Sequence, residues 1–273
     1  MVAGFGRVDA VDLGPAQSLR TVSYVRTSTP VSLVSAALSA SFPLGEALRA
    51  GVRFPLVIGN LAPPADERRS ATNLGNLEVG LQWRRPLSKN IDLRAALLLT
   101  LPTASGRELP NQSALDAAGP YADTISADHQ SISRAAEYSR GAEDDALFEP
   151  GRLGLTPRLG FDVHESGFHF EPFVKSELLV TTQDVPDTII VEFVAGGRIA
   201  YTLASWLDVG ARAWGVFTVA GTTTHSLDVG VVEPELRLSY KAFHSTAGAL
   251  LPFAGDLTSP YFVGARASIS VAL

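Results

Sequence analysis

The feature that most constrains the fold of this chain is an alternation of apolar and polar residues in long segments along most of its length. Between residues 77 and 84, Leu, Val, Leu and Trp alternate with Glu, Gly, Gln and Arg, and residues 263–273 repeat the pattern. A period of two puts successive side chains on opposite faces of a β-strand, whereas a helix requires a period near 3.6. The sequence therefore predicts an all-β protein.

The alternating segments predict about twelve strands and a single domain over residues 1–273. The expected strands are 19–28, 31–43, 47–59, 74–86, 90–104, 151–164, 168–182, 188–202, 206–219, 229–241, 244–255 and 260–273. The connections after the second, fourth, sixth, eighth and tenth strands are tight, and most of the others are longer. Tight turns at one end and long loops at the other are typical of a closed antiparallel up-and-down transmembrane β-barrel with periplasmic termini.

The composition favours a barrel in a membrane over a soluble barrel or sandwich. Charged residues make up only 18% of the chain, whereas a soluble domain carries about 25%. The apolar faces of the expected strands bear almost no charge, and aromatic residues such as Trp83, Phe161 and Tyr240 lie near strand ends, as they do at bilayer interfaces. We therefore expect a protein of the bacterial outer membrane, with outer-membrane lipid as its partner.

Two segments depart from the alternating pattern. Residues 1–17 lack alternation and contain Gly14-Pro15, so we expect an N-terminal extension rather than a strand. Residues 106–149 form a long extracellular loop whose nine acids and three bases give it a charge of −6, equal to that of the whole chain. This loop could fold inward as a constriction, lie over the mouth, bind a divalent cation through Glu143-Asp144-Asp145, or simply be solvated.

The polar faces of the expected strands carry an almost balanced set of charges, ten basic and nine acidic. We expect the following side chains to line the lumen: Arg53, Glu78, Arg84, Asp92, Arg94, Arg152, Arg158, Asp162, Glu171, Lys175, Glu177, Glu192, Arg198, Asp208, Arg212, Glu233, Glu235, Arg237 and Arg266. Buried charges need partners, so most of these should form a structural ladder of ion pairs. The alternative is a polar channel that selects permeants by charge.

Several motifs resemble a known family. The run Asn73–Arg84, with its Asn-Leu-Gly-Asn start, is followed by Leu99–Gly106, which contains Leu-Pro-Thr. Together with residues 250–255 and 261–264, these segments are similar to small bacterial outer-membrane transporters of the phenol meta-degradation type, which are related to the fatty-acid transporter barrels. The resemblance implies passive uptake of small molecules, hydrophobic ones among them.

The expected function is therefore a passive outer-membrane channel without enzymatic activity. No cofactor is expected, because no phosphate-binding glycine loop is present, and no metal, because the histidines lack ligand spacing. The negative net charge also argues against a nucleic-acid partner. Two alternatives remain: a closed structural or adhesion barrel with a charge-filled lumen, and a phospholipase-like enzyme using His129 and Ser131, which resemble the His-x-Ser pair of outer-membrane phospholipases. The sequence identifies neither a permeant nor an oligomeric state.

Overall fold

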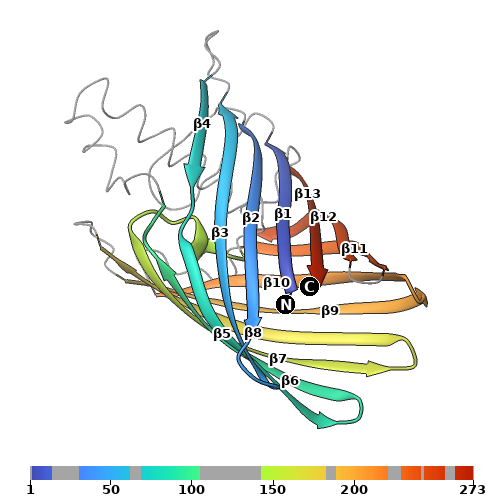
Figure 1. The fold of residues 1–273 in the computed structure, drawn as a ribbon. Coiled ribbons are helices and arrows are strands. Elements are labelled where there is room, and N and C mark those ends of the chain that lie inside the picture. Colours follow the sequence, from blue (N-terminus) through green and yellow to red (C-terminus); the bar gives the residue numbers. More distant parts are fainter. Residues whose placement is uncertain are drawn as a thin grey trace, which may run out of the picture.

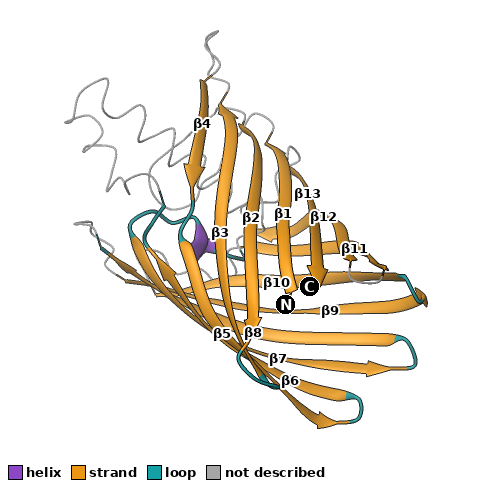
Figure 2. Ribbon diagram, in the orientation of Figure 1, coloured by secondary structure: helices purple, strands orange, loops and turns teal. Residues whose placement is uncertain are grey.

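The described part of the chain forms one antiparallel β-sheet of thirteen strands and one short 3₁₀ turn (Figures 1 and 2). The computed structural model describes residues 2–13, 31–61, 69–104, 143–182, 189–220, 229–240, 243–255 and 262–272. Within these ranges no helix has the length and hydropathy needed to cross a bilayer. Long hydrogen-bonded strands therefore make up nearly all of the regular structure.

The strands are long, between six and sixteen residues. Their bounds are β1 Val2–Leu13, β2 Val31–Pro43, β3 Leu48–Leu61, β4 Arg69–Leu74, β5 Leu77–Ser88, β6 Ile91–Leu101, β7 Arg152–Glu165, β8 Phe168–Thr181, β9 Ile189–Ala204, β10 Leu207–Ala220, β11 Val229–Tyr240, β12 Phe243–Gly255 and β13 Phe262–Ala272. The 3₁₀ turn η1 spans Asp145–Leu147. Eleven expected strands match β2, β3 and β5–β13 to within about three residues at either end.

Most strands pair with their neighbours along the chain, as in an up-and-down meander; the exception is β4 and β5, which both pair with β3. The pairings run from β5 to β13 without interruption, and β13 pairs with β1. Strand β1 also pairs with β2, and β2 pairs with β3 over thirteen residues. Val2 at the start of β1 lies in register with Ala272 near the end of the chain and with Ser41 beside a tight turn. Both ends of the chain thus lie at the tight-turn end (Figure 1).

Strands β4 and β5 act as two halves of one broken strand. Strand β3 pairs with β5 through residues 48–53 and with β4 through residues 56–61. Gly75 and Asn76 interrupt the strand between the two halves. A Cβ on Gly75 would lie 2.4 Å from Cγ of Pro55 and 2.5 Å from the carbonyl oxygen of Leu147, so only glycine fits there. The break therefore brings the backbone close to the segment that contains η1.

Two expectations about local structure are wrong. Residues 1–17 were expected to lack a strand, but β1 occupies Val2–Leu13. A strand can form there without strict alternation because two flanking strands supply backbone partners along its length. The connection expected at 60–73 contains the end of β3 and all but the last residue of β4. The Arg, Ser, Thr and Asn residues of β4 form no apolar face, so an alternation of apolar and polar residues does not predict this strand. The strand expected at 19–28 falls outside the described residues.

The distribution of buried side chains is inverted relative to a soluble protein. Among the described residues, sixteen buried residues are polar or charged and fourteen are apolar. Large apolar side chains instead cover the outer face, for example Leu97, Ile199 and Leu236, each about half exposed. A soluble monomer rarely exposes an apolar surface of this extent. The alternation therefore places charge on the inside and aliphatic groups on the outside.

Exposed aromatic residues gather near the strand ends, as the sequence predicts. Trp83, Phe168, Tyr201, Trp206 and Tyr240 lie close to tight turns and are exposed. At the opposite end, exposed aromatic side chains include those of Phe193 and Phe253. Aromatic residues in these positions are typical of the two interfaces of a bilayer.

Substitution of Leu97 by Arg should destabilise the fold by about 2–4 kcal/mol, because the outer face at this depth is predicted to contact lipid. Gln82→Arg is the matched control. Gln82 lies on the neighbouring strand, pairs in register with Ala96, and its side chain is exposed on the opposite face. Its replacement should change stability by no more than about 0.5 kcal/mol. Urea unfolding in lipid vesicles, followed by tryptophan fluorescence, measures both. Equal costs at the two positions would contradict the assignment of faces.

Candidate functional site

The inner face of the sheet, defined here as the face that carries residues 143–149, holds a chain of alternating charges. Arg94 on β6 pairs with Asp162 on β7 and, at 3.6 Å, with Glu171 on β8. Glu171 accepts a 2.9 Å hydrogen bond from Arg198 on β9. Arg198 in turn pairs with Glu235 on β11. These five residues, termed the charge belt, connect side chains from β6 to β11 across the inner face.

The charge belt satisfies the electrostatic requirement of an inside-out sheet. Asp162, Arg198 and Glu235 are buried, and an isolated buried charge would be costly. Each belt member contacts a charge of opposite sign on another strand. Because the partners come from different strands, the pairs also fix how those strands face one another. Arg84 and Asp92 form one further pair nearer the tight-turn end.

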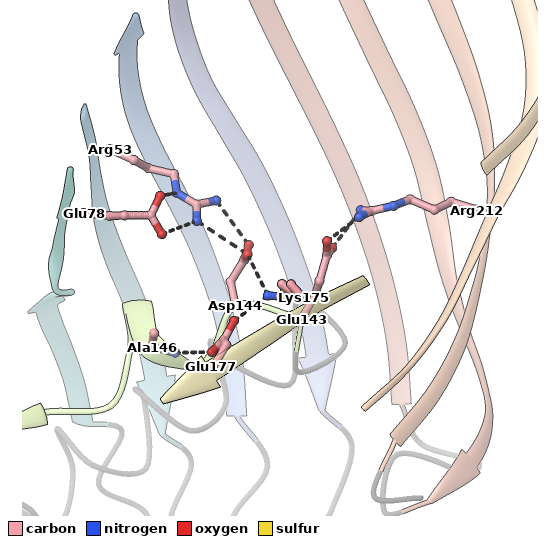
Figure 3. Close-up of polar contacts among 8 residues, drawn as sticks. All are labelled: Arg53, Glu78, Glu143, Asp144, Ala146, Lys175, Glu177 and Arg212. Carbon is pink, nitrogen blue, oxygen red and sulfur yellow. Dashed lines mark hydrogen bonds and ion pairs between the residues drawn. The ribbon is translucent and has the colours of Figure 1, made fainter. Parts of the chain in front are cut away.

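A second group of ion pairs fastens residues 143–149 to the inner face (Figure 3). Asp144 accepts a hydrogen bond from Arg53 at 3.3 Å and lies 3.7 Å from Nζ of Lys175. Glu143 receives two hydrogen bonds from the guanidinium of Arg212 on β10, one of them 2.7 Å long. The segment therefore bridges β3, β8 and β10. We call residues 143–149 the inner segment.

The wall cations that hold the inner segment also have acidic partners of their own. Arg53 forms two hydrogen bonds with Glu78, at 3.0 and 3.1 Å. Lys175 pairs with Glu177, whose other carboxylate oxygen accepts a 3.0 Å hydrogen bond from the backbone N–H of Ala146. Charge-assisted hydrogen bonds of this kind are the stronger ones in proteins. The inner segment is thus bound through both side chains and backbone.

Asn76, in the break between β4 and β5, also binds the inner segment by hydrogen bonds. The side-chain amide of Asn76 donates to the carbonyl oxygens of Ala146 at 2.8 Å and Glu149 at 2.6 Å. Its backbone N–H donates to the carbonyl of Leu147 at 2.7 Å, and its Oδ1 accepts from the backbone of Ala104. Asn76 is fully buried. Three of these four hydrogen bonds go to the inner segment, so Asn76 acts as a polar clasp that holds it.

The inner segment also carries apolar side chains into the interior. Leu147 and Phe148 are 1% and 2% exposed. Inward-facing apolar residues in the loop-end half of the strands are buried as well, among them Leu179, Val194 and Val216. A Cβ on Gly154 would come within 3.2 Å of Cβ of Ala146, so the small residue leaves room for the segment. Burial of this apolar surface adds to the ion pairs in holding the segment.

The remaining expected lumen residues are held in other ways. Asp208 accepts a 2.7 Å hydrogen bond from the hydroxyl of Thr202, and Arg152 lies 3.9 Å from Glu149. Glu192 and Glu233 are buried, and Arg237 interacts electrostatically with Glu171. The guanidinium of Arg158 lies 4.6 Å above the ring of Phe173. The strand β13 carries Arg266, but its side chain falls outside the described part of the structure.

One group of side chains in the described residues has a geometry that could hold a cation. Potential ligand atoms of Asp92, Asp162 and His164 all lie within 4.8 Å of one another. No spacing in the sequence indicates this group, because Asp92 and Asp162 come together only through the register of β6 and β7. Both carboxylates are already engaged by guanidinium groups, of Arg84 and Arg94 respectively. Their arrangement therefore serves ion pairing between strands.

The three acids 143–145 were one possible cation site in the sequence, and two of them bind basic side chains of the wall instead. Residues 143–149, the last part of the loop expected at 106–149, fold inward onto the strands. Residues 106–142, including His129 and Ser131, lie outside the described residues. Sequence reasoning missed Gly75 and Asn76 as functional residues, although both belong to the motif on which the family resemblance was based.

Comparisons with known proteins agree with this architecture. No protein-family model matches the sequence, and no curated protein matches it. An outer-membrane channel from Pseudomonas putida F1 has a similar structure, with a TM-score of 0.62 over 99% of this chain and 95% of that one, at 11% identity. The NanC porin gives 0.55 over 99% and 100% of the two chains, at 7% identity. The chain therefore has the fold of outer-membrane β-barrel channels and porins.

Replacement of Asn76 by Ala should loosen the inner segment by about 1–3 kcal/mol, because two carbonyl groups lose a buried donor. Hydrogen exchange of the backbone amides of residues 146–149 should accelerate accordingly, while the strands remain protected. The control is Asn90→Ala, since Asn90 lies in the tight turn between β5 and β6. Unchanged exchange in Asn76→Ala, with the barrel still folded, would show that the clasp does not hold the segment.

Proposed function

We propose that this protein is a passive outer-membrane channel for small molecules, with the inner segment as its constriction. The observation that carries the proposal is the inverted burial: an aliphatic outer face encloses buried ion pairs. Such a sheet has no favourable state in water, but it matches a bilayer outside and a polar lumen inside. The fold shared with outer-membrane channels and porins supports the same function.

The proposal includes a closed barrel of twelve strands, in which β4 and β5 count as the two halves of one broken strand. The pairings of β1 with β2, β2 with β3 and β13 with β1 support closure, because they link the first strands to the last one. Closure leaves no edge strand to meet lipid with unpaired backbone groups. The tight-turn end, where both chain ends lie, would face the periplasm and the long loops the outside.

We further propose that the nineteen charged residues predicted from the sequence line the lumen. Twelve strands enclose a space between the filled eight-stranded barrel and the open sixteen-stranded porin. The inner segment and the charge belt narrow that space, so the channel suits small permeants. Membership of the phenol meta-pathway family is part of the proposal, supported by residues 73–84 and 99–106.

The inner segment is placed to act as a gate. It touches β3, β8 and β10 through Glu143 and Asp144, and it occupies the loop-end half of the interior. Removal of both carboxylates leaves a nearby acid for each wall cation, because Arg53 keeps Glu78 and Lys175 keeps Glu177. Arg212 retains an attraction to Glu233. The segment can therefore be released without leaving buried positive charges unpaired.

The double variant Glu143→Gln/Asp144→Asn should show larger or more frequent conductance steps than the wild type in planar bilayers, because the gate loses its ion pairs. Glu46→Gln/Glu165→Gln is the matched control, since it removes two exposed carboxylates at tight turns. Its conductance should equal that of the wild type. Heat-modifiable gel mobility verifies that each variant is folded.

Other outcomes would favour the competing functions. Absence of conductance in every variant, together with no uptake in liposome swelling, would support a closed structural or adhesion barrel. Calcium-stimulated phospholipid hydrolysis that is lost in Ser131→Ala would support the enzyme centred on His129 and Ser131.

A further inference from the structure

Two ion pairs of the inner face, both formed by residues in the tight-turn half of their strands, expose the basic partner far more than the acidic one. In the pair of Arg84 with Asp92, the side chains are 60% and 7% exposed. In the pair of Arg94 with Asp162, the values are 45% and 11%. The acids thus lie beneath the guanidinium groups. A solute that enters from the tight-turn end meets positive charge at these pairs, although the acids and bases nearly balance in number.

Arg158 differs from Arg84 and Arg94, because its guanidinium forms no ion pair with any described residue. It is exposed on the inner face of β7, two residues from Gly160, which is in register with Arg94. Its cross-strand partner in register is another cation, Lys175. Like charges directly opposite one another destabilise a sheet unless another group compensates them. The position therefore favours an anion, and no described residue forms an ion pair with Arg158.

The acids nearest to Arg158 are already committed to other cations. Glu143 and Asp144 attract it electrostatically, but Glu143 binds Arg212 through two hydrogen bonds and Asp144 binds Arg53 and Lys175. Arg53 and Arg212 also repel it. Both carboxylates that attract Arg158 are thus already paired with other basic side chains.

Phe173 orients the guanidinium groups around this position. Its ring centroid lies 4.6 Å from Cζ of Arg158 and 5.0 Å from Cζ of Arg212. Stacking on an aromatic ring holds a guanidinium plane by its face and leaves the N–H edge available. That edge matches the two oxygens of a carboxylate, which it binds through parallel hydrogen bonds.

We propose that Arg158, held on Phe173, is a binding site for the carboxylate group of a small organic anion, and that the exposed arginines 84 and 94 line the route to it from the tight-turn end. The site rests on the proposed channel function and specifies its permeants as carboxylates. Arg158 is the residue that determines this preference. A bound carboxylate would supply the negative partner that Arg158 lacks among the described residues.

The test uses acetate as the probe and the full-length protein folded in detergent. Line broadening of ¹³C-acetate reports binding even when it is weak. Wild type and Arg85→Gln should broaden the signal, because Arg85 is exposed on the opposite face of β5 and shows no ion pair in the described structure. Arg158→Gln should weaken acetate binding about tenfold or more, and Arg158→Lys should retain part of it. Heat-modifiable mobility confirms folding.

A second measurement separates this site from the channel function. In planar bilayers under a KCl gradient, the reversal potential should shift toward cation preference in Arg158→Gln and stay unchanged in Arg85→Gln. Equal acetate broadening by wild type and Arg158→Gln, or none by the wild type, overturns the site even if the protein conducts. Acetate binding that depends on Arg158 in a protein without conductance supports the site and rejects the passive channel.

Discussion

Every part of this structure depends on the pairing of charges in the interior. The outer face is aliphatic, so the polar half of each strand must turn inward, where an unpaired charge costs more than the sheet could compensate. The charge belt from Arg94 to Glu235 meets that requirement across β6–β11. The same requirement explains why the inner segment carries acids, because its carboxylates neutralise wall cations on β3, β8 and β10.

Two kinds of interaction hold the inner segment, and they differ in how easily they can be reversed. Glu143 and Asp144 pair with Arg53, Lys175 and Arg212. Each of these basic residues also pairs with, or is attracted to, another acid, so the ion pairs of the segment can break without leaving a buried base unpaired. The hydrogen bonds of Asn76 and the burial of Leu147 and Phe148 have no such substitutes. In the proposed gate, the charged end at Glu143 and Asp144 would therefore open more easily than the part held by Asn76.

The polar faces of the strands carry nearly equal numbers of acidic and basic residues, but these side chains are not equally exposed. In the pairs of Arg84 with Asp92 and of Arg94 with Asp162 the acid is buried and the guanidinium is exposed, whereas Arg198 is more buried than its partner Glu171. Arg158 forms no ion pair with a described residue, and its guanidinium lies over the ring of Phe173. A count of charges therefore says little about which permeants a lumen favours, because exposure decides which charges a solute meets.

The sequence by itself determined the class of fold and the place of eleven strands, because a period of two identifies a β-strand without reference to other strands. It could not place β1 or β4, whose stability comes from neighbouring strands rather than from an apolar face of their own. Only the tertiary structure decided which charges meet. Arg212 and Glu143 are 69 residues apart, and Asn76 and Ala146 are 70 apart. Such contacts depend on strand register and on the path of the loop, neither of which leaves a local pattern in the chain.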